Sequence, residues 1–351
     1  MKNIHRILVA ALVCAASVAS AQTVEGTSYY LPKTALRLTL LVEKTTYQPG
    51  EFAAYAQRYM KKNDVQLESS TTYRLIDTKI ATFALPDTAK RFTLSLDKRY
   101  SISEVARTDN GILLAINAEG KTIEKPAKFV AAPKPKPLNP KDYMNEDILT
   151  AGSTAKMAQL IAQEIYDIRD SRNQLQRGQA EFMPKDGQQL QIMMAGLDTQ
   201  ERALRQVFEG VTERDTTELT LEFIPTEPVE RQLLFRFSRH FGLVDADDLS
   251  GAPYYLRITA EAKPQQPEEP KKKDKDDIGL NVNMPVKTTA TLYDGNAPIK
   301  KLDFQAPQFG TIENLSGALF GKKQTSKIIL NPITGGLESI KEVAIEKQNK
   351  I

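Results

Sequence analysis

The sequence predicts an α+β protein in which β-rich N-terminal and C-terminal domains flank an antiparallel helical hairpin. Three observations predict this class. Between Gly152 and Gly210, apolar residues recur at three- and four-residue steps, as on one face of a helix. On both sides of that stretch, apolar and polar residues alternate in short segments, as in half-buried strands. A proline- and lysine-rich stretch before the helices is typical of an extended linker.

Start and stop signals divide the helical stretch into two helices. Ser153 is placed to cap the first helix, and Gly178 is placed to end it in a left-handed turn. Asp186 and Gln189 have the spacing of a capping box at the start of the second helix. The connection, Gln179–Lys185, is short enough to make the two helices antiparallel neighbours.

Changes in composition divide the whole chain into five segments. They are a signal peptide (1–21), a β-rich domain with one short helix (22–130), a Pro/Lys linker (131–150), the helical hairpin (151–210) and a second β-rich domain (211–351). Within the last segment, residues 263–277 are rich in proline and in charges that nearly cancel. Because such a segment buries little apolar surface, we expect a disordered loop there.

The N-terminus has the features of a secretory signal peptide. Lys2 and Arg6 precede an apolar run that is too short to span a membrane, and Ala19-Ser20-Ala21 is a typical cleavage site. We therefore expect export to the periplasm, the cell surface or the medium. No later apolar run is long enough for a transmembrane segment. Cleavage lowers the formal net charge from +3 to about +1, which gives no support for nucleic acid as a partner.

The residues left after cleavage exclude several kinds of chemistry. Cys14 and His5 lie in the signal peptide, so the mature chain keeps a single imidazole, that of His240. Disulfides, cysteine nucleophiles and Cys/His zinc sites are thereby excluded. No Gly-rich phosphate-binding loop is present, and we expect no cofactor and no metal.

Residues in the helical stretch and on its flanks stand in an order shared with a known family. They are Gly152-Ser153, Lys156, Ala158, Ile161, Ile165, Ile168-Arg169, Arg172, Leu175 and Gly178, then Leu197-Asp198, Glu201, Leu204 and Phe208-Glu209-Gly210, with Tyr30–Thr34 and Gln308–Gly310 on the flanks. In these residues the chain resembles an uncharacterised family of secreted proteins from Bacteroidota, a domain of unknown function. The resemblance implies a source and a compartment, but no activity and no site residues.

Ser153 and Lys156 form an S-x-x-K sequence at the head of a helix, where serine β-lactamases and penicillin-binding proteins hold their nucleophile. No K-T-G follows, and no S-D-N or Y-x-N lies between the serine and the C-terminus. A helix cap and a surface lysine are therefore the favoured interpretation. His240 is favoured as a packed or surface residue over a general base, because no Ser-His-Asp order accompanies it.

The acidic turn at Asp245, Asp247 and Asp248 is favoured as solvated over calcium-binding. The twelfth position counted from Asp245, where an EF-hand needs a bidentate glutamate, is Leu256.

Arg172 and Glu201 place charges on the apolar stripes of the two helices. A buried charge needs a partner, because an unpaired one costs several kcal/mol. If the turn is centred near Phe182, Arg172 faces roughly residue 192, on the order of 13 Å along the helix from Glu201. We therefore expect each residue to reach out to the flanking domains, as a structural tie or as an anion clamp.

Together these observations favour a non-enzymatic secreted or periplasmic protein that binds a partner protein or a component of the cell envelope such as a glycan. The alternative is a hydrolase that uses a carboxylate pair or the Ser153–Lys156 pair.

Overall fold

The computed structural model describes residues 26–123, 127, 129–261 and 276–344. The predicted signal peptide, 1–21, and most of the predicted disordered loop, 263–277, lie outside the described residues. The strands are β1 (Gly26–Gln48), β2 (Ser70–Ser95), β3 (Val105–Arg107), β4 (Leu113–Ile116), β5 (Val211–Phe223), β6 (Val229–Ser238), β7 (Gly242–Val244), β8 (Ala252–Ala260), β9 (Asp277–Asp294), β10 (Ala297–Ser316), β11 (Gln324–Leu330) and β12 (Leu337–Ala344). The helices are α1 (Glu146–Leu149), α2 (Thr154–Arg177) and α3 (Gly187–Glu209), with short helical turns η1 (Ala53–Tyr55), η2 (Ala56–Met60), η3 (Pro140–Tyr143) and η4 (Gly317–Leu319).

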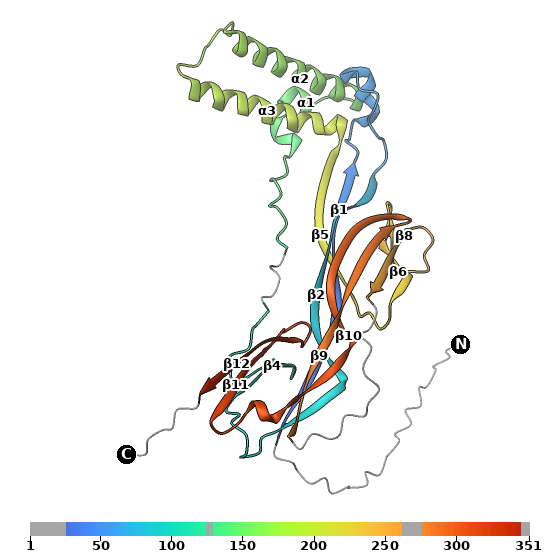
Figure 1. The fold of residues 1–351 in the computed structure, drawn as a ribbon. Helices are drawn as coiled ribbons and strands as arrows, with labels where there is room; N and C mark the ends of the chain where they lie inside the picture. The colour runs from blue at the N-terminus through green and yellow to red at the C-terminus, as the bar shows by residue number, and fades with distance from the viewer. Residues whose placement is uncertain (1–25, 124–126, 128, 262–275, 345–351) are drawn as a thin grey trace, which may run out of the picture.

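Two β-sandwiches are stacked along the length of the molecule (Figure 1). In the upper sandwich, which lies nearer the helices, the sheet β2-β1-β5 packs against the sheet β10-β9-β8-β6-β7. The alternation of Leu36, Leu38 and Leu40 along β1 turns all three side chains into this core, where none is exposed. They meet aromatic residues of the facing sheet such as Phe235 and Tyr254.

In the lower sandwich, the sheet β12-β11-β4-β3 packs against the other ends of β1, β2, β9 and β10. Tyr29 of β1 and Leu280 of β9 are buried there with Phe320. The same long strands therefore pass through both cores, and the two sandwiches share their frame.

Between the two cores, the side chain of Gln308 in β10 bonds to β1. We call this region the waist. The side-chain amide of Gln308 donates to the Thr34 carbonyl oxygen at 2.8 Å and to the Pro225 carbonyl oxygen at 3.1 Å. Its oxygen accepts from the Thr34 backbone N–H at 3.1 Å. Gln308 lies in a bulge of β10, between Ala306 and Thr311, where the strand leaves its register with β9. The bulge leaves the Gln308 side chain free to bond the backbone of β1, as a neighbouring strand would.

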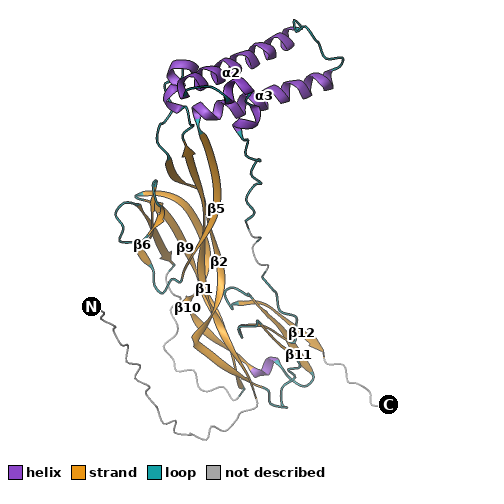
Figure 2. Cartoon of the chain, turned by 180° about the vertical axis from the view of Figure 1, so that it is seen from behind, coloured by secondary structure: helices purple, strands orange, loops and turns teal. Residues whose placement is uncertain are grey.

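The helices form a head across the upper end of the β1–β2–β5 ribbon (Figure 2). The inner half of the α2–α3 pair buries a core with η1 and η2, in which Phe52, Ile161 and Phe208 have almost no exposed area. No helix among the described residues is both long enough and apolar enough to cross a membrane.

The predicted fold class, two β-rich domains flanking a helical hairpin, is wrong. The described chain is mostly β-sheet, and its α-helices lie at one end of the molecule (Figures 1 and 2). Strands from before and after the helices also share sheets: β5 pairs with β1, and β11 pairs with β4. Alternating residues identify a strand, but they do not identify its partner, which here lies far away in the sequence.

Candidate functional site

Ser153 and Lys156 are both exposed, and the serine is a helix cap. Its hydroxyl accepts from the Lys156 backbone N–H at 3.2 Å, which satisfies a free amide of the first turn of α2. The serine–lysine pair therefore has a structural role in holding the start of the helix.

His240 and the acidic turn lie on the surface of the upper sandwich. His240 is exposed in the turn between β6 and β7. Asp248 accepts from the Ser250 backbone N–H at 2.9 Å. Hydrogen bonds from the side chain of Ser250 and then from its backbone lower the pKa of the Asp248 carboxyl. Among the described residues, no group of three or more His, Cys, Asp or Glu side chains is arranged to hold a metal ion.

Arg172 and Glu201 contact each other directly, so the expectation that they reach away from each other is wrong. Arg172 Nη1 donates to Glu201 Oε2 at 2.8 Å, and Arg169 Nε donates to Glu201 Oε1 at 2.7 Å. Arg172 also donates to Asp198 at 2.8 Å. Both oxygens of a side chain that is 7% exposed are thus matched by guanidinium groups.

The error came from the assumed centre of the turn. Pairing of Arg172 with Glu201 places the crossing point of the helices near residue 186 rather than near Phe182, because the two numbers average to between 186 and 187. The first turns of α3 therefore extend beyond the last residue of α2. The connection between the two helices has to fold back beside these turns. Helical periodicity determines the face of the helix on which a residue lies. It does not determine which residue of a neighbouring helix lies opposite.

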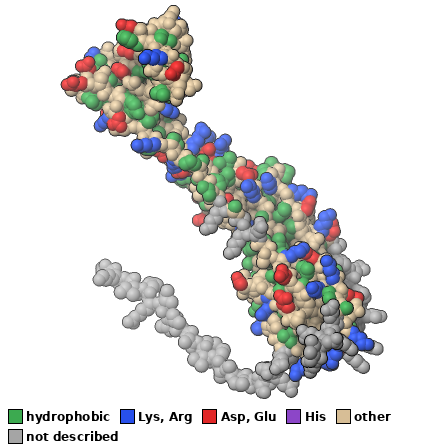
Figure 3. Space-filling model, turned by 90° about the vertical axis from the view of Figure 1, so that its left-hand side faces the viewer, with side chains coloured by type: hydrophobic (Ala, Val, Ile, Leu, Met, Phe, Trp, Pro, Cys, Tyr) green, Lys and Arg blue, Asp and Glu red, His purple; other side chains and the backbone are tan. Residues whose placement is uncertain are grey.

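At the far end of the head, which we call the tip (residues 175–197), the α3 part is uncharged and poorly covered, whereas the connection before it carries charged residues. Between Gly187 and Leu197, α3 contains no charged residue and none that is buried. Phe182 is 80% exposed and Ile192 is 67% exposed. Beside them, a hollow of about 470 Å³ is lined by Leu175, Phe182, Met193 and Leu197 among others. Basic and acidic side chains are interspersed along the elongated face seen in Figure 3, on the head as well as on the body.

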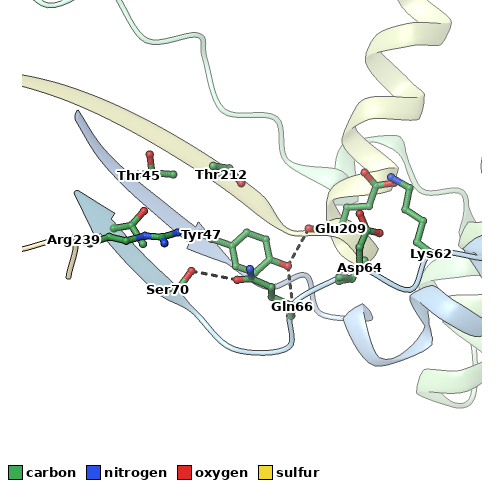
Figure 4. A pocket seen from close by; sticks show the side chains of 11 residues that line it. Thr45, Tyr47, Lys62, Asp64, Gln66, Ser70, Glu209, Thr212 and Arg239 are labelled. Atoms are coloured by element: carbon green, nitrogen blue, oxygen red, sulfur yellow. Dashed lines mark hydrogen bonds and ion pairs between the residues drawn. The ribbon is translucent and has the colours of Figure 1, made fainter. Parts of the chain in front are cut away.

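A second hollow, of about 370 Å³, lies at the neck between the head and the ribbon (Figure 4). Its lining residues come from β1, the 61–70 segment, β2, the α3–β5 junction and the β6–β7 turn. They are Thr45, Tyr47, Lys62, Asp64, Val65, Gln66, Ser70, Thr72, Glu209, Thr212 and Arg239. We call this hollow the neck pocket.

The Tyr47 hydroxyl fastens the neck. It donates to the Gln66 carbonyl oxygen at 2.9 Å and lies 3.1 Å from the Glu209 carbonyl oxygen, so it joins the 61–70 segment to the end of α3 (Figure 4). Burial raises the pKa of Tyr47, which keeps the hydroxyl protonated as a donor.

Glu209 forms the charged end of the neck pocket. Burial acts to raise its pKa, but hydrogen bonds from Arg205 and Lys62 outweigh that effect and hold the pKa below its ordinary value. Both cations lie 2.8 Å from the carboxylate. Glu209 therefore stays ionised and is neutralised within the protein.

The sequence profile of the family described as Domain of unknown function (DUF4831) matches residues 25–338. The chain belongs to this family. The match confirms the predicted resemblance to a domain of unknown function, whereas a source in Bacteroidota and secretion stay predictions. Searches of curated proteins and of solved structures gave no match.

Sequence reasoning missed both the tip and the neck pocket. For the tip a signal was present, because a surface helix with no charge from Gly187 to Leu197 is unusual. For the neck pocket there was none, because its residues come from four separate stretches of the chain whose approach only the fold defines.

Proposed function

We propose that this protein is an exported, non-enzymatic binding protein that docks a partner protein through the tip of its helical head. The observation that carries the proposal is the uncharged, exposed run of α3 from Gly187 to Leu197, beside the exposed ring of Phe182. Depletion of charge together with methionine and aromatic residues is the composition of the centre of a protein interface.

The local packing also supports a docking role. The inner half of the head has its own core, closed by η1 and η2, so the tip contributes little to that core. Met193 lines the hollow, and Met183, which follows Phe182 in the chain, is 45% exposed. Flexible thioether side chains adapt well to a partner. An apolar surface that the protein itself does not use is a typical interaction site.

The shape of the molecule suits this role. The ribbon holds the head at one end of an elongated body, and the helices extend sideways from it (Figures 1 and 2). A partner that approaches the tip meets no other part of the described chain. The body then acts as a spacer that presents the tip.

Export is the other half of the proposal, and it rests on the order of Lys2, the apolar run and Ala19-Ser20-Ala21. We expect the exported protein to begin at Gln22. N-terminal sequencing of the protein from culture medium or envelope fractions tests this directly, and a chain that begins at Met1 would contradict it.

The docking proposal is tested by site-specific photo-crosslinking in the cells that produce the protein. A photoreactive residue replaces Ile192 in the tip, and a matched one replaces Leu249, which is 81% exposed on the upper sandwich. We expect position 192 to form a discrete adduct with a protein, whereas position 249 does not. Phe182→Lys, which replaces the exposed aromatic ring by a charge beside the hollow, should abolish that adduct. Equal adducts at both positions, or adducts with lipid only, would refute docking of a protein at the tip.

A further inference from the structure

The neck pocket gathers polar side chains that have no partner in the protein. Within the described residues, the side chains of Arg239 and Asp64 form no ion pair, and the hydroxyls of Thr45, Thr72 and Thr212 form no hydrogen bond. All five line the same hollow. Donors and acceptors grouped in one concave site are the feature that fixes a small ligand.

The register of the ribbon places the hydroxyl groups on a single face. Thr45 of β1 is paired with Thr72 of β2, and Tyr47 is paired with Ser70 on one side and with Thr212 on the other. Paired residues of neighbouring strands point to the same side of a sheet. Two successive rows of hydroxyls therefore form the floor of the pocket.

Arg239 is held beside this floor by its own turn. Its carbonyl oxygen accepts from the Tyr73 backbone N–H at 2.7 Å, which fixes the β6–β7 turn to the edge of β2. Gly242, with a φ of +77°, packs so closely that an added Cβ would lie 3.2 Å from the Tyr73 ring. The backbone at the arginine is thus positioned, while its guanidinium group is left unpaired.

The lining holds two cations, Lys62 and Arg239, and two carboxylates, Asp64 and Glu209, and only one cation and one carboxylate of these are paired with each other. Lys62 is neutralised by Glu209 at 2.8 Å. Arg239 is therefore the unpaired cation of this lining, and an acidic group of a ligand would be attracted to its end of the pocket. The Thr45 and Thr72 hydroxyls beside it both donate and accept, as the hydroxyls of a sugar require.

We propose that the neck pocket binds a small acidic saccharide of the uronate class. Its carboxylate pairs with Arg239, and its hydroxyls bond to the threonine hydroxyls of the ribbon. A volume of about 370 Å³ lies at the small end of the range for ligand pockets. This site is separate from the tip, and its occupation does not depend on a partner protein there.

The test measures binding to the purified mature protein by saturation-transfer NMR and by calorimetry. The probes are D-glucuronate, D-glucose, which lacks the carboxylate, and acetate, which lacks the sugar. We expect glucuronate to bind, with glucose and acetate each at least about tenfold weaker. Failure of all three probes to bind, or equal binding of acetate, would overturn the assignment.

Variants locate the site. Arg239→Gln should weaken glucuronate binding about tenfold or more, because a charge-assisted hydrogen bond is lost. Arg91→Gln removes an exposed arginine from the lower part of β2 and should leave binding unchanged. Thr72→Val keeps the shape and removes one hydroxyl, so we expect a smaller loss. Unchanged binding in Arg239→Gln would place the ligand elsewhere.

Discussion

Glu201 connects the two long helices more directly than any other charged residue of the described head. Its carboxylate accepts from Arg169 and Arg172 on α2, and Arg205 lies 3.9 Å away on its own helix. The Glu201 side chain is almost fully buried, whereas the three arginine side chains keep about a third of their area exposed. Loss of the carboxylate leaves cations facing one another, but loss of one arginine leaves another in place.

We therefore predict unequal effects on the free energy of unfolding. Glu201→Gln should lower it by about 2–4 kcal/mol, because a buried ion cluster loses its only anion at the centre. Arg172→Gln should lower it by about 1 kcal/mol, since Arg169 still pairs with Glu201. Asp198→Asn, at an exposed partner, is the control and should cost less than about 1 kcal/mol. Urea denaturation checks the order, and a larger loss for Arg172→Gln than for Glu201→Gln would contradict it.

The sequence located this residue pair but not its geometry. The period of 3.6 residues correctly placed Arg172 and Glu201 on the inner faces, where both contact the other helix. Their relative positions along the helix axes depend on how the connection folds. The assumption of a symmetric turn was wrong. An anion-clamp role for the pair stays a prediction, although both oxygens of Glu201 already bind protein groups.

At the scale of elements, local signals predicted the ends of helices well. Ser153 and Asp186 cap α2 and α3 through their side chains, and Gly178 ends α2 with a φ of +70°. These features depend on a few neighbouring residues, so the sequence contains them. The pairing of β5 with β1 depends on residues far apart, and no local pattern predicts it.

The neck depends on glycine at a point where two backbones touch. An added Cβ at Gly50 would lie 2.3 Å from the Val207 carbonyl oxygen of α3. Phe52 donates its backbone N–H to that same oxygen at 2.7 Å, so the approach is fixed by a hydrogen bond. The contact joins the end of β1 to the head, and neither side can move without breaking it.

Gly50→Ala should therefore destabilise the protein by more than about 2 kcal/mol, because it forces the backbones apart. Gly196→Ala is the matched control in the interior of α3. An added Cβ there meets nothing within 4 Å, and alanine should stabilise the helix by about 0.5–1 kcal/mol. Thermal denaturation of the two variants measures both the expected loss of stability in Gly50→Ala and the expected gain in Gly196→Ala. If Gly50→Ala melted at the temperature of the parent protein, the neck contact would not restrain the head.

At the scale of the whole molecule, the waist explains why the two flanking motifs of the family resemblance belong together. Tyr30–Thr34 and Gln308–Gly310 are far apart in the sequence, yet Gln308 forms three hydrogen bonds there, two of them with Thr34. Asn283 reinforces the same region by donating to the Pro32 and Thr334 carbonyl oxygens. The motifs therefore mark the place where long strands pass from one core to the other.

Shared strands predict that the two sandwiches unfold as one unit. β9 places Leu280 in the lower core and Leu292 in the upper core, and neither side chain is exposed. Once either core opens, β9 loses the frame that orders the other half. A substitution in one core should therefore lower the stability of both cores equally, even though the sites are separated by the length of the strand.

Leu280→Ala tests this coupling, with an expected loss of about 2–5 kcal/mol for a large-to-small change in a core. Hydrogen–deuterium exchange is measured on peptides of β8, in the upper sandwich, and of β11, in the lower one. We expect exchange of the most protected amides to accelerate by the same factor in both, because both then open only by global unfolding. Leu256→Ala, in the upper core, is the reciprocal variant and should give the same pattern. Acceleration confined to the sandwich that carries the substitution would show that the cores open independently, and that the long strands connect them without coupling them.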